Sequence, residues 1–232
     1  MYTRFLDGFQ EMSRSSSLFF VGVYMRQYEA RTFGDFLRKI AYDYARYGYT
    51  EYAVREIPQG KDIRAVDEKL LRVYGVTYHY TTRAKRRKAG KANVAYVRYK
   101  RRFILMAQPG EGETWNRVVR RNLQVEPLLI GGYELRVRGK TPVITIAERR
   151  WRRVRALVLG LALHPEPRVR HLLVTWLQRV FPYSFPGIVQ QKRRLVRAVN
   201  RRRKTAGLPL VTGAALAPVT RVESGDGRTW YY

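Results

Sequence analysis

The sequence contains no cysteine, and that absence removes several kinds of site at once. Structural disulfides, cysteine-ligated zinc and a thiol nucleophile are all excluded from this chain. Histidine is nearly as scarce, with three residues among 232. Any catalytic or metal-binding chemistry must therefore come mainly from carboxylates, hydroxyls, amines and guanidinium groups.

Long apolar runs are also missing. The longest run, residues 156–163, is much shorter than the roughly 20 residues that a membrane-spanning helix needs. Residues 1–30 lack a basic segment followed by a clean apolar core, which is the pattern of a secretory signal peptide. These features predict a soluble, cytoplasmic protein with no membrane partner.

Acidic residues are few compared with basic ones. The chain has 18 Asp and Glu against 46 Lys and Arg, for a formal net charge of +28. Repulsion among so many cations costs stability, so a polyanionic partner would offset it. Nucleic acid is the leading candidate, because each phosphate that a Lys or Arg neutralises releases counterions.

Arginine outnumbers lysine by 36 to 10. Arg makes planar, bidentate contacts with phosphates and guanine edges, and it stacks on bases. A GC-rich genome also raises the arginine content, but it does not explain the net charge. The chain is nevertheless too apolar to be a disordered basic tail, since 45% of its residues are hydrophobic and 13% aromatic.

Apolar periodicity and turn residues predict an α+β arrangement over residues 1–147. Strands are expected at residues 18–24, 50–57, 76–80, 93–99, 103–107, 128–138 and 142–147. Helices are expected at residues 32–47, 62–74 and 114–123. The basic stretch at residues 83–93 contains Gly90 and is expected to be a loop.

After residue 147 the pattern becomes helical. Three helices are expected at residues 148–163, 168–181 and 188–204, separated by segments that contain proline. The predicted fold class is therefore α+β, a mixed sheet with β-hairpins and packed helices followed by a basic three-helix C-terminal region. The expected domains are an α+β nucleic-acid-binding domain (1–147), a basic helical region (148–205) and a flexible tail (206–232).

The positive charge is concentrated in two segments, and the first is residues 83–102. It has ten basic residues and no acidic residue: Arg83, Lys85, Arg86, Arg87, Lys88, Lys91, Arg98, Lys100, Arg101 and Arg102. Four aromatic residues flank or interleave them: His79, Tyr80, Tyr96 and Tyr99. Such aromatics can stack on unpaired bases while the cations follow the backbone. The alternative is a solvated basic loop with tyrosines in ordinary strand positions.

The second basic segment, residues 148–204, has sixteen basic and two acidic residues. Its last helix is expected to expose a nearly continuous cationic face: Lys192, Arg193, Arg194, Arg197, Arg201, Arg202, Arg203 and Lys204. Two helices that support a basic third one are typical of helix-turn-helix domains. The turn at residues 182–186 is longer than in that motif, so a helix lying along phosphates is an equally good interpretation.

Catalytic signatures are weak. A metal-dependent nuclease needs two or more carboxylates at one point, and the nearest candidates are Glu51, Glu56 and Asp62. Glu51 and Glu56 are five residues apart and so lie on opposite faces of the expected strand. A metal-free ribonuclease could use His79, beside the basic segment. No metal site or cofactor is predicted, and Mg²⁺ would be needed only by a nuclease.

Three hypotheses follow from the sequence. The first is a nucleic-acid-binding protein that contacts phosphates through an Arg/Lys-rich loop and a basic C-terminal helix. The second is a nuclease or strand-transfer enzyme, and the third is a structural RNA-binding subunit of a ribonucleoprotein. A basic α+β body with an arginine-rich helix is typical of proteins from mobile genetic elements. The choice between DNA and RNA and the oligomeric state stay open.

Overall fold

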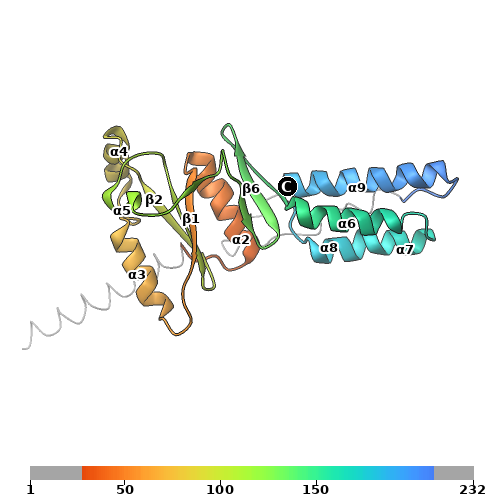
Figure 1. Ribbon diagram of the computed structural model, residues 1–232, viewed down its shortest axis with the longest axis horizontal. Helices are drawn as coiled ribbons and strands as arrows, with labels where there is room; N and C mark the ends of the chain where they lie inside the picture. Colours follow the sequence, from red (N-terminus) through yellow and green to blue (C-terminus); the bar gives the residue numbers. More distant parts are fainter. Residues whose placement is uncertain (1–27, 212–232) are drawn as a thin grey trace, which may run out of the picture. The chain divides into compact units, whose positions relative to one another are not determined.

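The computed structural model of the protein describes residues 28–211 (Figure 1). The chain divides into two compact units, Met1–Asn122 and Leu123–Tyr232. The described residues combine helices with two antiparallel sheets of four and three strands, which confirms the α+β prediction. The strand expected at residues 18–24 and residues 212–232 of the expected tail lie outside the described residues.

The sheet of the first unit contains β1 (Glu51–Glu56), β2 (Val94–Tyr99), β3 (Arg102–Ala107) and β4 (Arg121–Asn122). The strand order is β2-β3-β1-β4. Strands β2 and β3 form the predicted hairpin, with Val97 opposite Ile104. Lys100 lies in its tight turn and has a positive φ of 55°. β1 pairs with the other side of β3, so β3 lies inside the sheet.

Helices cover both faces of this sheet (Figure 1). α2 (Phe33–Arg38) continues through η1 (Lys39–Tyr44) and η2 (Ala45–Tyr47). Phe36 of α2 is fully buried, and its ring centroid lies 6.2 Å from that of Tyr99 at the end of β2. α3 (Ile63–Val73) covers the other face, where Leu71 joins a buried cluster that includes Tyr96. Residues of β2 are therefore covered on both sides.

The basic stretch expected as a loop is instead a helix, α4 (Tyr80–Lys88), and the strand expected at residues 76–80 is a turn leading into it. Arg, Lys and Ala dominate α4 and are strong helix formers. Gly90, with a φ of 67°, follows the helix end. The helix expected at residues 114–123 is also shorter, because α5 (Glu113–Asn116) ends before β4 begins.

The second unit begins with a sheet of β5 (Leu128–Ile130), β6 (Tyr133–Arg138) and β7 (Thr141–Ile146), in that order. Residues 128–138 were expected to be one strand. They form two strands because Gly131 and Gly132 have φ angles of 57° and 83° and make a tight turn between them. The hairpin of β6 and β7 is confirmed.

The helices of the second unit are α6 (Glu148–Gly160), α7 (Glu166–His171), η3 (Leu172–Trp176), α8 (Leu177–Val180) and α9 (Pro186–Thr205). α7, η3 and α8 follow one another without a break, so the three expected helical segments are present (Figure 1). α9 also packs on β7, where the Gln191 side chain bonds both the N–H and the C=O of Ile146, at 2.8 and 3.2 Å.

The division between the two units follows Asn122, whereas the boundary expected after residue 147 falls at the junction of β7 and α6, inside the second unit. Across residues 28–211 no helix has the length and apolar character needed to cross a bilayer.

Candidate nucleic-acid interface

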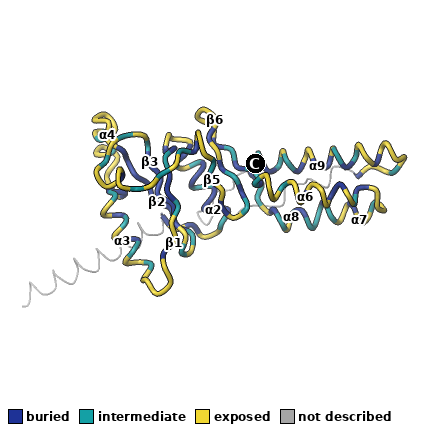
Figure 2. The backbone as a smooth tube through the Cα atoms, viewed as in Figure 1, coloured by how far each residue is buried: buried dark blue, intermediate teal, exposed yellow. Residues whose placement is uncertain are grey.

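α4 presents the first group of expected binding residues, and most of its length is exposed (Figure 2). We call its outward cations the α4 set: Lys85, Arg87, Lys88 and the nearby Lys91, all exposed. No member of this set is in an ion pair with another described residue. Unpaired exposed cations are free to contact phosphates.

Two arginines of α4 point toward the protein instead. Arg83 donates from Nη2 to the carbonyls of Val76 and Val94, both at 2.9 Å. Arg86 donates to the carbonyl of Ala92, also at 2.9 Å. These contacts attach α4 to the sheet through guanidinium groups rather than through apolar side chains. Both residues therefore serve the fold of α4.

The β2–β3 hairpin offers fewer cations than the sequence predicted. Lys100 and Arg102 are exposed, with Arg102 3.9 Å from Glu56. Arg101 donates to the carbonyls of Ile57 and Lys61, at 3.0 and 2.9 Å. Its guanidinium group therefore joins the hairpin to the segment between β1 and α3.

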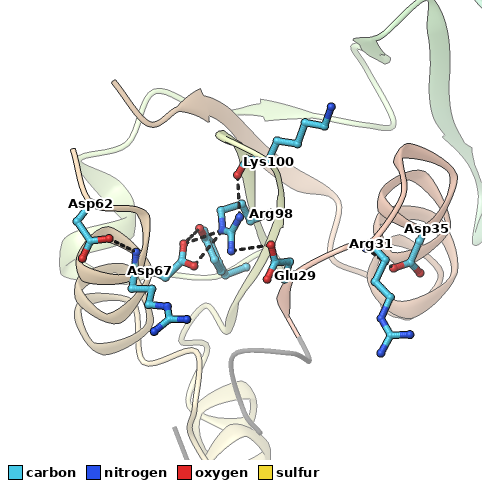
Figure 3. Close-up of polar contacts among 9 residues, drawn as sticks. Glu29, Arg31, Asp35, Asp62, Asp67, Arg98 and Lys100 are labelled. Atoms are coloured by element: carbon cyan, nitrogen blue, oxygen red, sulfur yellow. Dashed lines mark hydrogen bonds and ion pairs between the residues drawn. The ribbon is translucent and has the colours of Figure 1, made fainter. Parts of the chain in front are cut away.

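Arg98 was expected to contact nucleic acid, and its buried position corrects this expectation. Figure 3 shows its guanidinium group pointing toward Asp67 and Glu29, with which it forms ion pairs of 2.9 and 3.1 Å. It also donates to the carbonyl of Lys100 at 2.8 Å. Asp67 accepts a further hydrogen bond from the hydroxyl of Tyr96. The network connects α3 to β2 and leaves Arg98 no access to a phosphate.

The network also changes the acidity of its members. Burial raises the pKa of Asp67 above its usual range, although the Tyr96 hydrogen bond and the charge of Arg98 act in the opposite direction. Burial and the bond to Asp67 raise the pKa of Tyr96. Both shifts follow from a polar cluster held inside the core, where charged forms are poorly solvated.

α9 presents the second group of expected residues. Its buried side includes Ile188, Leu195 and Val199. The opposite side carries five exposed cations, which we call the α9 set: Arg193, Arg194, Arg197, Arg201 and Lys204. Within residues 28–211 none of the five is ion-paired. Five of the eight cations expected on this helix are therefore exposed opposite its buried side.

Three other cations of α9 are held by the fold. Lys192 and Arg203 are buried, which corrects the expectation that they bind nucleic acid. Lys192 donates from Nζ to the carbonyl of Phe181 at 2.6 Å, and Arg203 donates from Nη1 to the carbonyl of Ala162 at 2.8 Å. Arg202 is exposed but donates to the carbonyl of Leu159 at 2.9 Å. These bonds join α9 to α6, to the turn that follows α6, and to the residue that follows α8.

No individual residue of α6 was among those expected from the sequence to bind nucleic acid. The structure places Arg149 and Arg153 on its exposed side without an ion pair among the described residues, whereas Arg152 pairs with Glu148 at 2.7 Å. The charge count over residues 148–204 included these arginines. Their four-residue spacing, which puts Arg149 and Arg153 on one helix face, is the signal that identifies them.

The four catalytic candidates are placed in separate environments. Glu51 accepts from Trp115 Nε1 at 2.7 Å and pairs with Arg120 at 3.2 Å. Asp62 caps the N-terminus of α3, and Glu56 is exposed. Within the part of the chain that the structure describes, no group of three His, Asp or Glu side chains could hold a metal ion.

His79, the fourth catalytic candidate, is exposed at the start of α4. Its Nδ1 lies 3.0 Å from the hydroxyl of Thr81, and its ring contacts that of Tyr80. Among the described residues, His79 and the acidic candidates do not form a group that could hold a metal ion. Comparisons of the chain with protein-family models, with curated proteins and with solved structures give no match.

Proposed function

We propose that the protein binds nucleic acid by contacting backbone phosphates with the α4 set and the α9 set. The observation that carries this proposal is the α9 set, five exposed cations opposite the buried side of one helix, with no acidic partner among the described residues. An isolated protein would gain nothing from such a row, because like charges repel. A polyanion offsets that repulsion.

The spacing within the α9 set suits a line of phosphates. Arg193, Arg197 and Arg201 follow one another at intervals of four residues, which places each about 6 Å along the helix axis from the next. Guanidinium groups bind phosphate oxygens in a bidentate way. We expect α9 to lie along a nucleic-acid backbone, which gives affinity with little sequence preference.

The proposal includes a cellular location and an origin for the protein. Nucleic acid is available to the protein in the cytoplasm, where we expect it to act. An origin in a mobile genetic element is in keeping with a basic protein that handles DNA or RNA.

The salt dependence of binding tests the proposal. A variant with Arg193→Gln, Arg197→Gln and Arg201→Gln should bind a duplex of about 20 base pairs, two helical turns, with a smaller salt slope. Each phosphate contact contributes about 0.9 to the slope of log K against log salt. Three lost contacts should therefore reduce the slope by about 2.7, measured by fluorescence anisotropy.

The matched control removes the same charge from arginines that already have acidic partners. Arg117, Arg136 and Arg170 pair with Glu113, Glu134 and Glu166, at 3.1, 2.7 and 2.7 Å. Changing these three to Gln should alter the slope much less. Equal effects of the two triple variants would show that α9 is not the contact surface. No binding of DNA or RNA by the unaltered protein at low salt would contradict the proposal as a whole.

A further inference from the structure

Tyr80 is the most exposed large aromatic residue near the α4 set. It begins α4, and 74% of its surface is accessible to solvent. Burying an aromatic ring is strongly favourable in water, so a ring left this open is available to stack on a partner. It lies on a surface whose neighbouring charges are positive and would attract a polyanion.

Tyr78, in the segment leading to Tyr80, contacts two other parts of the protein. The guanidinium carbon of Arg86 lies 5.3 Å from the centre of the Tyr78 ring. Gly75 also lets the ring approach the backbone, since a Cβ on Gly75 would lie 2.2 Å from a ring carbon of Tyr78. Tyr78 therefore has contacts within the protein and is 46% exposed, whereas Tyr80 is 74% exposed.

The ring of His79 packs against the ring of Tyr80. The two ring centroids are 4.3 Å apart, with their planes inclined at 50°. The His79 ring is itself held by the contact between Nδ1 and the Thr81 hydroxyl, at 3.0 Å. The backbone carbonyl of His79 accepts a hydrogen bond from the N–H of Arg83 at 3.0 Å, in the first turn of α4. These contacts reduce the freedom that Tyr80 would lose when it stacks on a base.

Cations lie along the same side of α4 as Tyr80. Ala84, Arg87 and Lys88 follow Tyr80 at intervals of four, seven and eight residues, which is the spacing of one helix face. Arg87 and Lys88 are thus displaced from Tyr80 by about 10–12 Å along the axis. Because the side chain of Ala84 is small, it does not obstruct the surface between the Tyr80 ring and these two cations. A strand whose base lies on Tyr80 can therefore run toward these cations with its phosphates.

We propose that Tyr80 is a stacking site for an unpaired nucleobase, so that this face of α4 binds single-stranded nucleic acid. The proposal depends on the proposed function and adds the class of substrate. Every base has an aromatic face, so stacking tolerates any sequence. Bases in a duplex are already stacked on each other, and the Tyr80 ring can reach only those that are unpaired.

The test compares how the 232-residue chain binds single strands and a duplex. The probes are fluorescein-labelled oligo(dT) and oligo(rU) of about 15 nucleotides and a duplex of about 20 base pairs, followed by anisotropy. We expect Tyr80→Ala to weaken single-strand binding about five- to 150-fold, the range for one lost stacking contact. Duplex affinity and the salt slope should stay unchanged, because no charge is removed.

Two variants control for effects unrelated to stacking. Tyr80→Phe keeps the ring and should keep single-strand affinity close to that of the unaltered protein. Tyr47→Ala removes another tyrosine with 65% exposure, located in η2 and outside the α4 face, and should have no effect. Circular dichroism should show the same helix content in all three variants, since both tyrosines are exposed.

The two proposals fail in different ways. If the unaltered protein binds single strands and Tyr80→Ala binds them equally well, the stacking site is wrong and the proposed function still holds. If Tyr80→Ala weakens single-strand and duplex binding alike, Tyr80 is not a site for unpaired bases. If the unaltered protein binds no probe at low salt, both proposals are wrong. A preference for oligo(rU) over oligo(dT), or the reverse, identifies the strand chemistry that the site accepts.

Discussion

Arg98 and Asp67 form an ion pair inside the first unit, with Nε of the arginine 2.9 Å from Oδ2 of the aspartate. The side chains are 7% and 4% exposed. Taking two such charges out of water is costly, and their attraction offsets that cost only when hydrogen bonds are also satisfied. Here Glu29 and Tyr96 supply those bonds. The pair therefore connects β2 to α3. Arg98 has this structural role although it belongs to the basic segment, residues 83–102, that was expected to bind phosphates.

Removing one partner of this pair should destabilise the first unit strongly. Arg98→Met takes away the cation that faces the buried Asp67 carboxylate and leaves the Tyr96 hydroxyl as its hydrogen-bond donor. A loss of about 3–5 kcal/mol in the free energy of unfolding is expected, the range for a buried charge left unpaired. Urea denaturation followed by circular dichroism measures it.

The pH dependence of the Arg98→Met variant has a definite sign. Burial already raises the pKa of Asp67, and losing Arg98 removes an influence that lowers it. A carboxyl with a raised folded-state pKa binds more protons in the folded than in the unfolded state, so stability falls as the pH rises through that range. The loss should thus be larger at about pH 7 than near pH 3.8, the ordinary pKa of an aspartate. If nucleic-acid affinity fell while stability did not change, Arg98 would be a contact residue after all.

Replacing Glu51 or Glu56, two residues of β1, should change the stability by different amounts. Glu51→Ala leaves Trp115 Nε1 without its 2.7 Å acceptor and Arg120 without its ion pair. An unsatisfied buried donor costs about 1–3 kcal/mol, so the free energy of unfolding should fall by that amount. Glu56→Ala changes an exposed residue and should stay within about 0.5 kcal/mol. Thermal and urea unfolding of both variants measure the difference. The opposite ranking would mean that Glu51 does not anchor Trp115.

The buried cations could have been recognised from their positions in the pattern of apolar residues. In β2 Arg98 continues the alternation of Val94 and Tyr96, two buried residues. A charge at such a position needs a partner in the interior. The partner itself could not be predicted, because Asp67 is 31 residues away and its approach depends on how α3 packs on the sheet.

The buried cations of α9 could have been recognised in the same way, whereas the inward arginines of α4 could not. Lys192 and Arg203 occupy positions on the face of Ile188, Val196 and Val199, all buried. The predicted cationic face was therefore right only for the residues on the opposite side. Residues 83–93, which include most of α4, were expected to be a loop because they are basic and contain Gly90. The inward positions of α4 are instead filled by arginines, which bind backbone carbonyls that no sequence pattern reveals.

Gly75 should not tolerate a side chain, because its backbone has a positive φ and the ring of Tyr78, just before α4, lies close to it. It has a φ of 57°, and a Cβ there would lie 2.2 Å from the Tyr78 ring. Gly75→Ala should cost about 1–3 kcal/mol of stability through backbone strain and displacement of that ring. Gly60→Ala is the matched control, since Gly60 has a φ of 83° but a Cβ added there would meet nothing within 4 Å. It should lose only the backbone contribution, about 1 kcal/mol. Equal losses in urea unfolding would show that Tyr78 does not pack on Gly75.

Lys192 should make the stability of the second unit depend on pH in the alkaline range. It is 5% exposed, and burial lowers its pKa from 10.5 to about 8. Between these values the unfolded state binds more protons than the folded state, so the free energy of unfolding rises with pH. The rise from this group should approach about 3 kcal/mol.

The measurement compares the unaltered protein with Lys192→Met by urea unfolding at several pH values between about 8 and 10.5. The comparison is needed because burial raises the pKa of Tyr44, Tyr96 and Tyr133, and a tyrosine with a raised folded-state pKa loses stability as the pH rises. The methionine variant shares that loss and lacks the gain from Lys192. The stability difference between the two proteins should therefore shift in favour of the unaltered protein as the pH rises through this window. A difference that stays constant would mean that Lys192 keeps its ordinary pKa, and that its bonds to Phe181 and Gln178 solvate the ammonium group as well as water does.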